Sequence, residues 1–145
     1  MNKEQLVEFN KDRKIRQICY VTRDYKETIK YFCEFLNIGP WTIIAHSDAV
    51  TKEIKLNGKS VDTPFRFICA FAFIGEMQIE VIQPVSGEDP YSEFLKEKGP
   101  GIHHIKECIC DNERLSKAIS EYEKKGIEVA YQGKYKEDLF FFATS

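Results

Sequence analysis

The sequence has almost no net charge, because its 21 lysines and arginines are nearly balanced by 23 aspartates and glutamates, giving a formal charge of -2 at pH 7. It also lacks any long run of like charge. Proteins that bind nucleic acid or an anionic membrane surface usually carry a clustered basic patch. The charge pattern therefore argues against nucleic acid and against a membrane as partners.

Long apolar segments are missing as well. No apolar run is long enough to span a bilayer, and residues 1–14 are polar, without the apolar stretch of a secretory signal peptide. Yet 43% of the residues are hydrophobic and 13% are aromatic, which is ample for a packed core in 145 residues. We expect one domain, or two half-domains that share a core.

The cysteines do not indicate a disulfide framework. There are five of them, an odd number, and Cys108 and Cys110 form the only closely spaced pair. A zinc ion at this Cys-x-Cys would need further ligands, and no second cysteine pair supplies them. We expect reduced, mostly buried thiols in a cytoplasmic protein.

Hydrophobic periodicity divides the chain into strands and helices. Asp24 is expected to cap the first long helix, with Glu27 as its capping-box partner, and Gly39-Pro40 is expected to end it. The predicted helices cover residues 24–37, 91–98 and 112–125, and the predicted strands cover 14–22, 41–45, 53–56, 65–74, 77–83, a segment opening at 101, 127–131 and 139–143.

The layout of the first half returns in the second. Counting from Gln17, an aspartate follows after 7 residues and a glycine after 22, and the same two spacings follow His104. Two matches at the same landmarks predict a duplicated unit, with Gln17 and His104 at equivalent positions. The predicted parts are an N-terminal arm (1–14), a first module (15–84), a linker with a short helix (85–100) and an incomplete second module (101–145).

Two adjacent histidines follow the turn Gly99-Pro100-Gly101. On a regular strand, side chains alternate between faces, so His103 and His104 are expected to point in opposite directions. They could not then both bind one ion. His104 would share its face with Lys106 and Cys108.

Several stretches of the sequence resemble one known superfamily. They read YVTRD (20–24), NIGPW (37–41), MQIEVIQP (77–84), DPYSEFL (89–95) and GIHHI (101–105). Together they make residues 15–143 similar to the vicinal oxygen chelate superfamily, and most similar to its methylmalonyl-CoA epimerase and glyoxalase I (lactoylglutathione lyase) members. The resemblance implies an α+β fold in which paired βαβββ modules form a curved mixed sheet around a cleft.

The resemblance also implies one divalent metal ion in that cleft. The family's ligand positions fall on Gln17, Glu80 and His104. A fourth ligand, a glutamate on the last strand of the second module, falls beyond Ser145. We therefore expect that strand to be missing, either because the sequence is truncated or because a partner chain supplies it.

A set of one imidazole, one carboxylate and one amide suits Zn, Ni, Co, Mn or Mg better than a closed structural zinc site. In enzymes of this kind the ion stabilises an enediolate after a base removes a neighbouring proton, on a small thioester or hemithioacetal. Arg66, Phe67 and Lys106 are candidates for contacts with the substrate. No residue is identified as the base.

Other interpretations stay open. Glu80 would be costly to bury unless it is paired or metal-bound, whereas Gln17 could simply bond a neighbour, Arg66 could be solvated, and Phe67 could belong to the core. Without an identified base, a metal-dependent isomerase, epimerase or lyase competes with a non-catalytic small-molecule-binding homodimer of the bleomycin-resistance kind. A structural remnant of the fold is a third reading.

Overall fold

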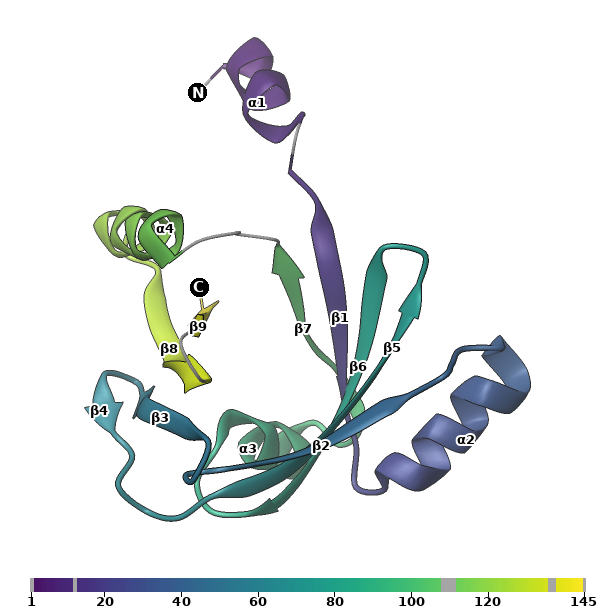
Figure 1. Cartoon of the computed structure of the whole chain (residues 1–145). Coiled ribbons are helices and arrows are strands. Elements are labelled where there is room, and N and C mark those ends of the chain that lie inside the picture. The colour runs from purple at the N-terminus through teal and green to yellow at the C-terminus, as the bar shows by residue number, and fades with distance from the viewer. Residues whose placement is uncertain (1, 12, 108–111, 136–137, 145) are drawn as a thin grey trace.

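Strands β1, β2, β5, β6 and β7 form one open sheet and strands β3, β4, β8 and β9 form another (Figure 1). The computed structural model describes residues 2–11, 13–107, 112–135 and 138–144. The first-sheet strands are β1 (Ile15–Val21), β2 (Thr42–Ser47), β5 (Arg66–Ile74), β6 (Met77–Ser86) and β7 (Gly101–Glu107). The second-sheet strands are β3 (Thr51–Leu56), β4 (Lys59–Ser60), β8 (Glu128–Tyr135) and β9 (Asp138–Thr144), and the helices are α1 (Lys3–Asn10), α2 (Tyr25–Leu36), α3 (Pro90–Glu97) and α4 (Asn112–Lys124).

The strand order confirms the expected α+β class and adds one departure. The first sheet has the order β2-β5-β6-β1-β7, and the second has the order β4-β3-β8-β9. Within residues 15–84, four strands and α2 keep the βαβββ order, but β3 and β4 leave that sheet, and β3 pairs with β8. The strands thus form two sheets where the sequence suggested a single curved one.

The centre of the first sheet joins both halves of the chain. β1 runs parallel to β6 on one side and antiparallel to β7 on the other. Among the described strands, β7 pairs with β1 alone, so it forms an edge of this sheet. Residues far apart in the sequence therefore lie on three adjacent strands.

Helix α2 covers one face of the first sheet. Asp24 caps it as expected, since its Oδ1 accepts hydrogen bonds from the backbone N–H groups of Lys26 and Glu27. The ring of Phe32 packs edge-on against Tyr20 of β1, with centroids 5.9 Å apart. This outer face is the one opposite the core.

The opposite, inner face carries the core. Helix α3 lies there, begun by Asp89, whose Oδ1 accepts hydrogen bonds from the backbone N–H groups of Tyr91 and Ser92. Tyr91 and Leu95 are buried against side chains of both sheets, namely Cys19, Val21, Ile54, Phe65, Phe67, Cys69, Ile82 and Tyr131. Helix α3 therefore stabilises the side of the sheet on which the candidate ligands lie.

The described cysteines agree with the expected thiols, since Cys19, Cys33 and Cys69 are free and two of them are buried. The Cys108 and Cys110 pair lies outside the described residues. In the part of the chain that the structure describes, none of the helices has both the length and the apolar character needed to cross a membrane.

Candidate metal centre

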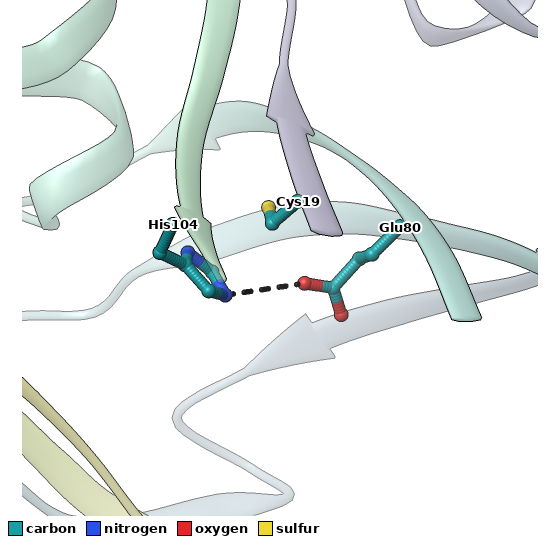
Figure 2. Close-up of side chains that lie close together, drawn as sticks. All are labelled: Cys19, Glu80 and His104. Carbon is teal, nitrogen blue, oxygen red and sulfur yellow. Dashed lines mark ion pairs between the residues drawn. The ribbon is translucent and has the colours of Figure 1, made fainter. Parts of the chain in front are cut away.

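Three potential ligands converge on the inner face of the first sheet. Cys19 of β1 is in register with Glu80 of β6 on one side and with His104 of β7 on the other. Their potential ligand atoms all lie within 4.8 Å of one another. Figure 2 shows the carboxylate and the imidazole facing each other, with His104 Nε2 3.7 Å from Glu80 Oε2.

A β-bulge in β7 sets the direction of the two histidines. Cys19 pairs with His104 while the next residue, Tyr20, pairs with Ile102, so β7 has one extra residue at this point. The Nδ1 atoms of His103 and His104 lie 2.8 Å apart, and His103 contacts Tyr91 of α3. The expectation that the two rings point to opposite faces is therefore wrong: both lie on the inner side.

The carboxylate of Glu80 is largely shielded from solvent. Burial raises its pKa, and hydrogen bonds from the thiols of Cys69 and Cys19 and from Gln17, with the charge of Lys106, act against that shift. The bond from Cys69 Sγ to Glu80 Oε1 measures 3.2 Å. Because thiols are weak donors, these partners replace only part of the lost hydration.

The imidazole of His104 is uncharged at neutral pH. Burial, together with the neighbouring His103 and Lys106, lowers its pKa to about 3. Its contact with Glu80 is therefore not an ion pair of two full charges, although the two groups are close. A neutral imidazole keeps a lone pair, which is the state that binds a metal ion.

Gln17 lies on the same inner face, two residues before Cys19 on β1. It is buried, with 6% of its surface exposed. Its Nε2 donates a hydrogen bond of 2.5 Å to Gln78 Oε1 on β6, and it also bonds Glu80. In this arrangement Gln17 braces the carboxylate of Glu80.

The three residues considered for substrate contact are spread over the molecule. Arg66 is exposed at the start of β5, and Lys106 is exposed on β7, two residues after His104. Phe67 is buried in the core, stacked on His46 at 4.9 Å and packed edge-on against Tyr91 at 5.3 Å. Of the three, Lys106 lies nearest the cluster in register, since it pairs with Gln17.

Sequence reasoning missed Cys19 and Cys69, and it named His103 but expected it on the opposite face. The sequence contained a signal for Cys19, because it is two residues from Gln17 and so lies on the same face of the strand. Cys69 had none, because its position depends on the register of β5 with β6. The inward direction of His103 depends on the bulge in β7.

The donor set fits a divalent metal ion. A carboxylate, an imidazole and a thiol offer oxygen, nitrogen and sulfur within a small volume. Sulfur favours borderline ions such as zinc, cobalt and nickel over magnesium, which prefers oxygen ligands alone. The incompletely solvated carboxylate of Glu80 is a second reason to expect a cation here.

Comparison with known proteins identifies the family. Residues 16–143 match the family model of the Glyoxalase/Bleomycin resistance protein/Dioxygenase superfamily. The chain belongs to this superfamily, which confirms the resemblance seen in the sequence.

Individual proteins match this chain either over a short segment or at low sequence identity. The uncharacterized protein YqjC of Bacillus subtilis (strain 168) is 40% identical over 53 residues, which cover 36% of this chain and only 37% of YqjC. The protein BH1468 of Bacillus halodurans C-125 has a TM-score of 0.54 at 20% identity, over 92% of this chain and 95% of that one. A methylmalonyl-CoA epimerase of Streptomyces coelicolor, in complex with 2-nitronate-propionyl-CoA, has a TM-score of 0.55 at 16% identity, over 91% and 96%. At these identities the two structures show a shared fold alone.

Proposed function

We propose that this protein is a divalent-metal-dependent isomerase, epimerase or lyase that transfers a proton next to a carbonyl group of a small thioester or hemithioacetal. The observation that carries the proposal is the convergence of Glu80, His104 and Cys19 on the inner face of the first sheet. Membership of the superfamily supports it, since glyoxalases belong there by name. We also propose a cytoplasmic location, which the free thiols of Cys19 and Cys69 support.

Each residue of the cluster has a distinct part in this proposal. Glu80 and His104 would hold the ion, with the Cys19 thiol as a third donor and Gln17 as a support or a further ligand. A bound divalent ion supplies a Lewis acid that stabilises negative charge on a substrate oxygen. The hydrogen bonds from Cys69 and Gln17 keep the Glu80 carboxylate oriented before any ligand arrives.

The class of substrate rests on two arguments of unequal weight. The Streptomyces coelicolor epimerase is bound to a coenzyme A compound, which favours a coenzyme A thioester. The epimerase-like stretch 89–95 carries less weight, because Asp89 caps α3 while Tyr91 and Leu95 lie in the core. Those residues support the fold, so the preference for a coenzyme A thioester depends on the ligand of that epimerase, and a glutathione hemithioacetal is the second candidate.

A second candidate function is a small-molecule-binding homodimer without catalysis. The outer side of β7 supports it, since Ile102 and Ile105 are 64% and 59% exposed there. Exposed neighbouring isoleucines are typical of a surface that a partner covers. Such a protein would bind little metal and would be dimeric in solution.

Metal content, measured by elemental mass spectrometry after loading with zinc, cobalt, nickel or manganese and desalting, tests the proposal. We expect one ion per wild-type chain and a loss of at least tenfold in affinity for His104→Ala and Glu80→Gln. Glu76→Gln is the matched control, because Glu76 is exposed on the turn before β6.

Substrate turnover is the second part of the test. In deuterated buffer, exchange of the proton next to the carbonyl group is measured as the loss of its NMR signal. The two substrates tested are methylmalonyl-CoA and a glutathione hemithioacetal. Metal binding and turnover that survive both the His104→Ala and the Glu80→Gln substitution would refute the proposal.

A further inference from the structure

The two histidine rings of β7 form a hydrogen bond with each other. Their Nδ1 atoms lie 2.8 Å apart, which is a hydrogen-bond distance. A ring nitrogen either carries a hydrogen and donates or presents a lone pair and accepts. One of the two Nδ1 atoms therefore carries a hydrogen and the other does not.

The backbone of Pro90 decides which ring donates. His103 forms a hydrogen bond with the backbone of this residue, at the first position of α3. Proline has no N–H group, so the partner is the Pro90 carbonyl oxygen, which can only accept. His103 therefore donates there through Nε2, since its Nδ1 faces His104. A neutral His103 then presents a lone pair at Nδ1.

It follows that His104 donates from Nδ1. Its other nitrogen, Nε2, carries the lone pair and lies 3.7 Å from Glu80 Oε2, beyond hydrogen-bond range. A lone pair and a carboxylate then face each other across a short gap. This is an arrangement that a cation placed between them would stabilise.

We propose that His103 is a positioning residue that holds the proton of His104 on Nδ1 and so keeps the Nε2 lone pair directed at Glu80. The bulge in β7 makes this possible, because it brings both rings to the inner face. Tyr91 and Phe94 of α3 hold the His103 ring edge-on, with centroids 5.2 and 5.1 Å away. Helix α3 thus acts on the tautomer of His104 indirectly, through its contacts with His103.

The inference rests on the proposed ligand role of His104, but it can be tested without any metal. The sequence has only three histidines, so a long-range ¹H–¹⁵N spectrum of the metal-free, ¹⁵N-labelled protein at pH 7 resolves each ring. We expect His104 to show a protonated Nδ1 and an unprotonated Nε2. A wild-type His104 with its proton on Nε2 would overturn the proposal.

Two variants of His103 distinguish the effect of its hydrogen-bond acceptor, Nδ1, from the effect of the size of its ring. His103→Phe keeps a ring against Tyr91 and Phe94 but removes the acceptor, whereas His103→Asn keeps an acceptor oxygen near the position of Nδ1. We expect His103→Phe to lose the Nδ1–H form of His104 and to bind zinc about 10- to 100-fold more weakly. We expect His103→Asn to retain the tautomer and most of the affinity. Equal tautomers and equal affinities in the two variants would contradict the proposal.

The outcome also distinguishes this inference from the proposed function. If wild-type His104 has its proton on Nδ1 but the protein binds no metal, the inference about the histidine pair is supported and the proposed metal centre is refuted. Stoichiometric metal binding with the proton of His104 on Nε2 in the metal-free protein would do the reverse.

Discussion

Cys69 donates its thiol hydrogen to the carboxylate of Glu80 across the β5–β6 pair, over 3.2 Å. The second thiol that bonds this carboxylate, that of Cys19, comes from the strand on the other side of β6. A buried carboxylate solvated mainly by sulfur is poorly compensated. Without a bound cation, this site therefore reduces the stability of the fold.

Removing the charge of Glu80 should stabilise the metal-free protein. Glu80→Gln keeps the shape of the side chain and removes the cost of burying a carboxylate, so we expect a free energy of unfolding about 1 kcal/mol higher than wild type. Urea denaturation at pH 7 with a chelator present measures it. The control, Glu76→Gln, breaks an exposed ion pair with Arg16 and should change stability by less than about 0.5 kcal/mol. A Glu80→Gln protein less stable than wild type would show that the carboxylate is well compensated.

The thiol of Cys19 should be visible in the spectrum of the cobalt-loaded protein. On binding, the thiol loses its proton to solvent, and a thiolate–cobalt bond gives charge-transfer absorption in the near ultraviolet. We expect this absorption in wild type and in Cys33→Ser, since Cys33 is exposed on α2. Its loss is expected in Cys19→Ser. If the band stays in Cys19→Ser, this residue is not a ligand.

Acid should weaken the metal-free fold through His104. Its pKa is lowered from 6.5 to about 3, so the unfolded chain binds more protons between these values and stability falls as the pH drops. For this one group, linkage predicts a loss of about 2 kcal/mol between pH 7 and pH 5. The raised pKa of Glu80 acts in the opposite sense, because the folded state then takes up a proton first.

Comparison with a variant isolates this histidine. Urea denaturation of metal-free wild type and His104→Leu at both pH values should show a smaller acid-induced loss in the variant. The lowered pKa values of His46 and His103 act in both proteins and so largely cancel. An identical loss in the two proteins would mean that His104 titrates normally.

Gly87 should tolerate no side chain, because of both its backbone and its surroundings. Its φ is +92°, and a Cβ there would lie 2.6 Å from Phe65 Cα and from the Pro64 carbonyl oxygen. We expect Gly87→Ala to lower the melting temperature strongly, with a loss above about 2 kcal/mol. Gly75→Ala is the matched control, since Gly75 also has a positive φ but a Cβ there meets nothing within 4 Å. It should lose only about 1 kcal/mol, and equal losses would remove the steric explanation.

Local sequence signals predicted most of the elements of this fold. The expected Asp24 cap is observed at the start of α2, and alternation outlined the strands that carry Gln17 and Glu80. Capping and alternation are properties of neighbouring residues, which is why a single sequence reveals them.

Long-range pairing was beyond the reach of those signals. The departure of β3 and β4 to the second sheet depends on β8, more than seventy residues further along the chain. The bulge at His103 and His104 exists only in the register of β7 with β1. Cys69 reaches Glu80 only through the register of β5 with β6. Sequence reasoning therefore named Gln17, Glu80 and His104. It missed the thiols of Cys19 and Cys69 that bond Glu80, and it missed the bulge that brings His103 against His104.

The pairing of β1 with β7 gives the candidate centre a high contact order. Cys19 and Glu80 become neighbours when the β1–β6 pair forms, and His104 joins them when β7 pairs with β1. The same strand, β7, thus completes both the candidate centre and one edge of the first sheet.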